Sequence, residues 1–244
     1  MPKLRLDKII ADHLSCTRNR AAEIIKNGRV SVGGAAVVSR AELVDPSADN
    51  ITLDKEPVKY RAFRYFMLNK PRGYLSATTD KRERTVLDLL DIEHLRLGLF
   101  PAGRLDKDAE GLLLLTNDGA LAHKIMSPGS KIGKRYFAEY HGDITSEDII
   151  AFSEGMVLAD GSKCLPAVIE PVSGGAIVTL FEGKYHQVKR MMAAIGKPVK
   201  RLIRISIGGL ELDSNLAPGQ YRELEEEVFH IFNDLETKKH KITK

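Results

Sequence analysis

Four consecutive leucines, residues 112–115, constrain the fold of this chain more than any other segment. They lie between Gly111 and the turn sequence Asn117-Asp118-Gly119, and such a short apolar run bounded by turn residues is typical of a strand buried on both faces. The run therefore predicts the central strand of a sheet. Directly before it, residues 103–111 (GRLDKDAEG) are polar and bounded by glycines, which predicts a loop leading into that strand.

The segments around this strand predict a domain of mixed secondary structure. Apolar runs interrupted by turn residues indicate strands, and apolar residues at helical spacing indicate helices. On residues 186–196 (HQVKRMMAAIG), Val188, Met191 and Met192 share one helix face, and Gly196 is expected to end the helix. The other strands are expected at 63–70, 135–144, 176–183 and 199–212, and the other helices at 85–94 and 120–127.

The first 58 residues predict a separate small α+β module. Leu6, Ile9 and Ile10 recur at helical spacing, and Thr17 can cap a second helix that stops at Asn27-Gly28. Gly33-Gly34 then predicts a tight hairpin. The polar segment 55–61 (KEPVKYR) is typical of a linker.

Composition excludes several classes of protein. Among the 244 residues, no apolar stretch approaches the roughly 18 residues that a membrane helix needs, and the N-terminus predicts no secretory signal. Two cysteines, Cys16 and Cys164, form no paired motif, which fits a cytoplasmic location. No nucleotide-binding or zinc-binding motif is present, so we expect an enzyme without cofactor or metal.

Positive charge is concentrated in two segments. Residues 1–30 carry seven Lys or Arg against three acidic residues, and residues 184–204 carry seven Lys or Arg and no acid. One such segment could be a solvated helix face, but two are typical of a nucleic-acid-binding protein. The side chains expected to contact RNA are Arg5, Lys8, Arg18, Arg20, Lys26 and Arg29 in the first segment and Arg190, Lys197, Lys200 and Arg201 in the second.

The loop before the leucine strand holds the candidate catalytic acid. A carboxylate beside a buried strand is exposed to desolvation and to nearby cations, which tunes acids, bases and nucleophiles. Asp106 occupies this position and Arg104 lies two residues earlier. Spacing alone does not choose among Asp106, Asp108 and Glu110, and a turn-capping role for Asp106 fits as well.

The loop GRLDKDAEGLLLLTNDG resembles the signature loop of the pseudouridine synthases, in the branch that modifies ribosomal RNA. The opening residues resemble the S4-like RNA-binding domain of that branch, and YFMLNKPRGYLSATTD, KRYFAEY and EGKYHQVKRMMAAIGKPVKRLIRISIGGLEL match further segments in order. The resemblance covers about residues 1–230. It implies an α+β fold with an S4-like domain at 1–58, a linker at 59–62, a catalytic domain at 63–230 and a tail at 231–244, the catalytic sheet being mixed, mainly antiparallel and flanked by helices.

The resemblance also assigns roles to residues. Asp106 matches the catalytic aspartate, and Arg104 matches the arginine that helps hold the flipped-out nucleotide. Tyr136, which spacing alone reads as a core aromatic residue, matches the tyrosine that stacks on the target uracil. Lys189, on spacing alone an exposed helix cation, matches the residue that pairs with the aspartate. Ala109 stands where the family usually has threonine or serine, so a hydroxyl that braces the loop is missing.

The implied reaction is the isomerisation of uridine to pseudouridine, by nucleophilic attack at C1′ or through a glycal. Within the branch the sequence is most similar to the enzymes of the small subunit, so the expected partner is 16S rRNA in a pre-ribosomal particle, modified by a monomer in the cytoplasm. The alternatives are a large-subunit 23S rRNA enzyme and a non-catalytic ribosome-assembly factor. A sugar- or nucleotide-processing enzyme with paired carboxylates fits less well.

Overall fold

The computed structural model describes residues 3–225 and residue 232. Two helices, α1 (Leu6–His13) and α2 (Arg18–Lys26), stand near its start. As predicted, Thr17 caps the second helix, because its Oγ1 accepts a hydrogen bond of 3.2 Å from the backbone N–H of Arg20. The helix ends at Asn27, followed by Gly28 at φ +70°. Local sequence signals therefore determine both ends of this helix.

Short strands complete the N-terminal module. The predicted hairpin is present, with Gly33 and Gly34 at φ +60° and +87°, values that suit a two-residue turn. The linker predicted for 55–61 is wrong at its start, because residues 56–57 pair with the preceding strand. The strands are β1 (Leu4–Arg5) paired with β4 (Leu43–Val44), and a sheet of β3 (Ala35–Ala36), β2 (Val30–Val32), β5 (Ile51–Leu53) and β6 (Glu56–Pro57) in that order.

A nine-stranded mixed sheet forms the rest of the fold. Its leucine strand is β9 (Glu110–Thr116), buried at every position, as the four leucines predict. The main path of the sheet runs β11 (Val168–Val172), β12 (Gly175–Leu180), β10 (Lys134–Glu139), β13 (Arg201–Ile207), β9, β7 (Tyr65–Lys70) and β15 (Tyr221–Glu223), with β14 (Leu210–Glu211) on β13 and β8 (Phe100–Pro101) on β9.

Strands β9 and β13 join two antiparallel portions of this sheet by a parallel pairing, in which Gly111 lies opposite Arg204. A Cβ at Gly111 would lie 2.3 Å from the carbonyl oxygen of Arg204, and its φ is +99°. Both the close approach and the dihedral angle require glycine. The glycine that ends the candidate loop is therefore the point where the two portions of the sheet meet.

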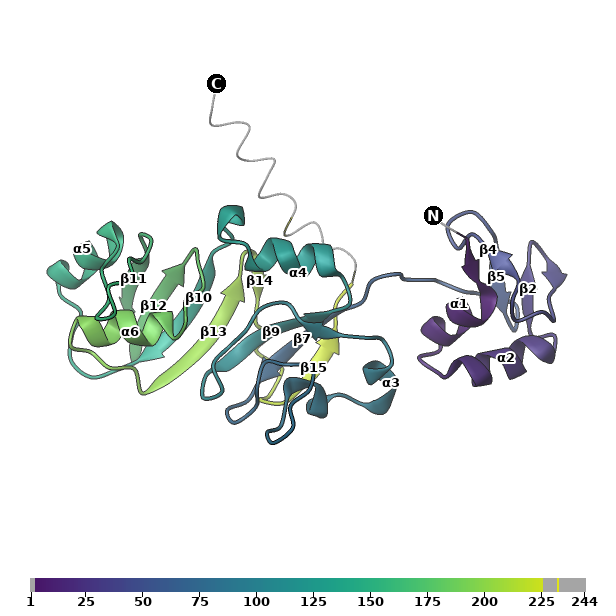
Figure 1. The fold of residues 1–244 in the computed structure, drawn as a ribbon, viewed down its shortest axis with the longest axis horizontal. Helices are drawn as coiled ribbons and strands as arrows, with labels where there is room; N and C mark the ends of the chain where they lie inside the picture. The colour runs from purple at the N-terminus through teal and green to yellow at the C-terminus, as the bar shows by residue number, and fades with distance from the viewer. Residues whose placement is uncertain (1–2, 226–231, 233–244) are drawn as a thin grey trace, which may run out of the picture. The chain divides into compact units, whose positions relative to one another are not determined.

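Helices cover the sheet and form two apolar clusters with it. Helix α4 (Gly119–Met126) packs Leu121 and Ile125 with Leu112 and Leu114 of β9. Helices α5 (Ser146–Glu154) and α6 (Gln187–Ala194) lie beside β10, β11 and β12 (Figure 1). Helix α5 and strand β11 were not predicted. The segment predicted as one helix at 85–94 contains a 3-10 turn (Val86–Leu89) and α3 (Ile92–Leu95), and a second 3-10 turn is Pro128–Ser130.

The chain divides into two units, residues 1–64 with 90–99 and residues 65–89 with 100–244. All residues of the candidate site below belong to the second unit. Among the described residues, no helix combines the length and hydropathy needed to span a bilayer. The predicted tail at 231–244 lies outside the described residues, apart from Phe232.

Candidate active site

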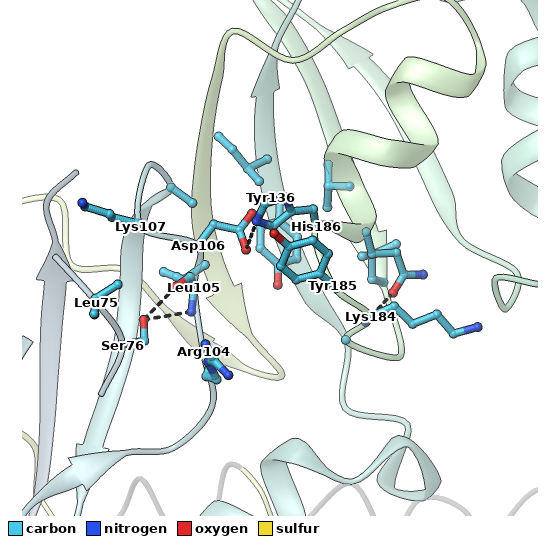
Figure 2. A pocket seen from close by; sticks show the side chains of 16 residues that line it. Leu75, Ser76, Arg104, Leu105, Asp106, Lys107, Tyr136, Lys184, Tyr185 and His186 are labelled. Carbon is cyan, nitrogen blue, oxygen red and sulfur yellow. Dashed lines mark hydrogen bonds and ion pairs between the residues drawn. The ribbon is translucent and has the colours of Figure 1, made fainter. Parts of the chain in front are cut away.

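Asp106 lies in the loop between β8 and β9, and its backbone is held from several sides. Ser76 Oγ accepts a hydrogen bond from the Leu105 N–H at 3.0 Å and lies 2.9 Å from the Leu105 carbonyl oxygen, to which it can donate (Figure 2). The Ala109 N–H donates to the Asp106 carbonyl at 3.1 Å. These bonds fix the loop on both sides of the carboxylate.

Lys70, at the end of β7, is the main support of this loop. Its side chain is fully buried, and its ammonium lies 2.8–3.3 Å from four carbonyl oxygens, those of Pro71, Asp106, Lys107 and Ala109. Burial lowers the pKa of Lys70 to about 8, while Asp108 and Asp106 favour its charged form. The Lys70 ammonium therefore binds three backbone carbonyl groups of the loop at once.

Ala109 shows how the loop holds together without the hydroxyl residue usual at this position. Its side chain is fully buried in the apolar cluster that includes Tyr136 and Val188. Its backbone receives the bond from Lys70 and donates the bond to Asp106. The bracing expected from a hydroxyl is thus supplied by Lys70 and Ser76.

The carboxylate of Asp106 faces two side chains of the segment that begins α6. Lys189 Nζ lies 2.9 Å from Asp106 Oδ2, and His186 Nε2 lies 3.5 Å from Asp106 Oδ1. Figure 2 shows His186 beside the aspartate, joined to it by a dashed line. The pairing of Asp106 with Lys189, two residues 83 positions apart, is the contact that the resemblance implied.

Lys189 also binds Asp108, at 2.5 Å, so one ammonium bridges both aspartates of the loop. Burial acts to lower the pKa of Lys189, but its bonds to Asp108 and Asp106 outweigh this effect and raise the pKa above its usual value. The same bond lowers the pKa of Asp108. The positive charge of Lys189 is therefore stabilised, and the exposed Asp108 is its second carboxylate partner.

Tyr136 and Arg104 line the same cavity of about 360 Å³ as Asp106. Tyr136 projects from β10 and is 8% exposed, so its ring forms part of the cavity wall. Arg104 is exposed, and its guanidinium makes no ion pair with any described residue, which leaves it available to an anion. Arg204 Nη1 donates to the Arg104 carbonyl at 3.4 Å and so links the loop to strand β13.

Arg204 is 2% exposed and carries no ion pair among the described residues. Its Nε donates to the Leu112 carbonyl at 2.8 Å, whereas Nη2 has no described partner. Lys134 lies on the neighbouring strand, and burial together with the charge of Arg204 lowers the pKa of Lys134 to about 8. Two buried basic side chains therefore lie on the adjacent strands β10 and β13.

Three of the four cations expected at RNA in the second basic segment are bound to carboxylates. Arg190 pairs with Asp160 at 2.5 Å, and Arg201 pairs with Glu110 at 2.6 Å. Lys197 pairs with Asp148 at 2.7 Å, with both side chains largely buried. The contact of Lys197 with phosphate stays a prediction, and this ion pair disfavours it because the charge already has a partner inside the fold. Lys200 contacts no described carboxylate and lies 3.3 Å from His141 Nδ1.

The N-terminal module contains both paired and unpaired cations. Arg5 binds Asp7 at 2.7 Å, Arg20 binds Glu23 at 3.0 Å, and Arg29 binds Asp54. The other three candidates, which form no ion pair with a described carboxylate, are Lys8, Arg18 and Lys26.

Sequence reasoning missed Lys70, Ser76, His186 and Arg204. The only local signal for Lys70 is a lysine that ends an apolar strand just before Pro71, a place where a charged residue is out of pattern. Arg204 likewise stands on the buried face of β13, between Leu202 and Ser206. A charged residue in a strand otherwise buried is a sign of a polar network.

Known proteins resemble this chain along its length. Residues 64–194 match the family model of RNA pseudouridylate synthases, and residues 4–50 match the S4 domain. The chain is 46% identical over 236 residues to an uncharacterised RNA pseudouridine synthase, YtzG, of Bacillus subtilis, covering 95% of this chain and 99% of the relative. It is 41% identical over 227 residues to ribosomal small subunit pseudouridine synthase A of Escherichia coli, covering 92% and 97%. A crystal structure of a pseudouridylate synthase matches with a TM-score of 0.66 at 35% identity, covering 94% of this chain and 99% of that one.

Proposed function

Because this chain belongs to the RNA pseudouridine synthase family, we propose that its substrate is a specific uridine of 16S ribosomal RNA. Isomerisation of uridine to pseudouridine is the family's activity, and the S4 domain binds RNA. The choice of 16S rRNA is supported by the 41% identity to a small-subunit enzyme over nearly the full length of both chains. A pre-ribosomal particle is the proposed form of the substrate.

We assign the chemistry to Asp106. In the reaction the N1–C1′ bond breaks, the uracil turns, C5 joins C1′, C5 loses its proton and N1 gains one, so no atom is gained or lost. Asp106 acts either as the nucleophile at C1′ or as the base that removes a proton from C2′. Lys189 holds the carboxylate in place for either route through its contact of 2.9 Å.

Access to the uridine requires that it leave the RNA stack, which costs a few kcal/mol. Tyr136 supplies a largely buried ring in the cavity wall on which the uracil can stack. Arg104 is exposed at the same cavity and has no carboxylate partner among the described residues. Its guanidinium can therefore bind a phosphate or fill the space that the base leaves.

The single observation that carries this proposal is the 2.9 Å contact between Lys189 and Asp106, set beside Tyr136 in one cavity. Residues from the loop, from β10 and from α6 converge there, separated by up to 83 positions in the sequence. A scaffold that only binds RNA gains nothing from holding a half-buried cation on a carboxylate that lines a cavity of about 360 Å³.

Mapping of carbodiimide-reactive pseudouridines on rRNA tests the proposal, with RNA from cells that contain or lack the protein. We expect one site in 16S rRNA to depend on the protein. Asp106→Asn should abolish that site while RNA affinity stays within a few-fold, because the side chain keeps its size and loses its charge. A protein-dependent site in 23S rRNA would transfer the activity to the large subunit, and no dependent site would favour an assembly factor.

A further inference from the structure

Tyr185 is an exposed aromatic residue at the rim of the catalytic cavity. Its side chain is 76% exposed, the highest value among the large hydrophobic residues described as exposed. The ring stacks on His186, with the ring centroids 3.8 Å apart and the planes inclined by 18° (Figure 2). His186 therefore covers one face of the tyrosine ring, and the opposite face is open.

The segment that carries this stack is held in place. His186 adopts a left-handed backbone conformation, φ 48° and ψ 34°, which is unusual for a residue other than glycine. The Lys184 N–H donates to Gln187 Oε1 at 3.0 Å, and Gln187 Nε2 donates to Glu182 Oε1 at 2.8 Å. Arg190 Nη1 donates to the Tyr185 carbonyl at 3.4 Å. The ring is thus presented by an ordered turn.

The position of the stack ties it to the substrate. Tyr185 and His186 line the cavity that holds Asp106, and His186 Nε2 lies 3.5 Å from the carboxylate. The rim also carries Lys184, which pairs with Glu182, and Arg104, which has no carboxylate partner among the described residues and can attract a phosphate. An open aromatic face in a positive surrounding is the arrangement with which proteins stack unpaired nucleobases.

We propose that the open face of Tyr185 stacks an unpaired base that adjoins the target uridine. This inference rests on the proposed function and adds a positioning residue to it. Tyr136 takes the target uracil inside the cavity, and Tyr185 holds the neighbouring base at the rim. The register of the RNA is then set by two rings, and the selection of the uridine depends in part on its neighbour being unpaired.

Four variants of the full-length protein test the role of the ring. Tyr185→Leu keeps an apolar side chain and removes the π face, and Tyr185→Ala removes both, so each should weaken binding to a 16S rRNA transcript by about 5- to 100-fold. Tyr185→Phe and Tyr185→Trp keep a ring and should bind within about twofold of the wild type. The slope of log affinity against log salt should not change in any of them, because stacking releases no counterions.

The second arm uses a hairpin that contains the mapped uridine, with an abasic nucleotide on either side in turn. With the base removed from the contacted side, Tyr185→Leu should bind as the wild type does, and single-turnover rates at saturating RNA should be alike for both proteins. Equal affinity of Tyr185→Leu and wild type for intact RNA would overturn the inference. A wild-type protein that modifies no rRNA would instead defeat the proposed function, and the transcript affinities of the four variants would still decide the role of the ring.

Discussion

Two segments of this chain each carry seven basic residues and use them differently. In residues 184–204, six of the seven basic side chains bind carboxylates or backbone oxygens, and Lys200 is the exception. Most of these acids lie far away in the sequence, at positions 106–160. In residues 1–30, by contrast, Lys8, Arg18 and Lys26 form no ion pair with a described carboxylate. The basic residues of a segment can therefore be counted as available to RNA only once the acidic residues that the fold brings to them are known.

The difference assigns separate tasks to the two segments. Cations that already hold a buried or half-buried carboxylate stabilise the catalytic unit and its site, since moving them to a phosphate would leave that carboxylate without a partner. Cations that face solvent without such a partner are the ones that can release counterions on binding RNA. We therefore expect chemistry to depend on residues 184–204 and salt-dependent affinity to depend on residues 1–30.

The largest effect is expected from Lys189→Met. Loss of the cation that holds Asp106 should slow the single-turnover rate at saturating RNA by about 100-fold or more, with little change in the salt dependence of affinity. Arg190→Met is the matched control, because the neighbouring arginine binds the exposed Asp160 instead. If Lys189→Met changed the salt slope and left the rate intact, the contrast between the segments would fail.

A smaller effect is expected in the N-terminal module, where a pair of double variants isolates the role of ion pairing. Arg18→Gln with Lys26→Gln should reduce the slope of log affinity against log salt by about 1.4–1.8, the value for two phosphate contacts. Arg20→Gln with Arg29→Gln removes the same charge from cations that already have partners, and should change the slope less. Titration of 16S rRNA binding against salt measures both, and equal changes in the two double variants would contradict the assignment.

Lys197→Gln should alter stability without altering the salt slope. Its ammonium bridges to Asp148, which also caps helix α5 by accepting from the Thr145 N–H at 2.8 Å. Removal of a largely buried partner should lower the free energy of unfolding by about 1–3 kcal/mol, less than for a pair fully sealed from water. Denaturant unfolding measures this change, and a reduced salt slope in the variant would restore Lys197 to the RNA-binding surface.

The smallest effect is a pH dependence of that same stability difference. The hydrogen bond from Lys197 lowers the pKa of Asp148 below its usual value of 3.8. A lowered folded-state pKa contributes stability that is present above the unfolded pKa and is lost as pH falls through the folded one. The gap between wild type and Lys197→Gln should thus be full near pH 6 and should shrink between about pH 5 and about pH 2. A gap that is constant over this range would exclude the ion pair as its cause.

Features set by neighbouring residues could be predicted from the sequence. The Thr17 cap, the Gly33-Gly34 turn and the leucine strand each depend on a few adjacent side chains, and each is present. The contact of Lys189 with Asp106 was predicted through the resemblance of two motifs to one family, since spacing alone reads the lysine as an exposed helix cation.

Features set by distant partners could not be predicted. The residue that binds Lys197 lies 49 positions earlier, and the carbonyls that surround Lys70 lie 36 to 39 positions later, apart from that of Pro71. Only the fold brings such groups together. From the sequence pattern, Lys197 therefore looks like a surface lysine and Lys70 like an unexplained charged residue in a strand. Strand β11 was missed for a related reason, since four of its five residues are not buried and its apolar pattern is weak.

The buried ammonium of Lys70 has a consequence for the entropy of RNA binding. A loop that orders only when its ligand arrives loses about 1–2 kcal/mol of backbone conformational entropy for each residue fixed. Here the carbonyls of Asp106, Lys107 and Ala109 already converge on Lys70 in the free protein, so this loss belongs to folding. The free energy of the RNA contacts can then offset the cost of flipping the uridine out of its stack, because none of it is needed to order the catalytic loop.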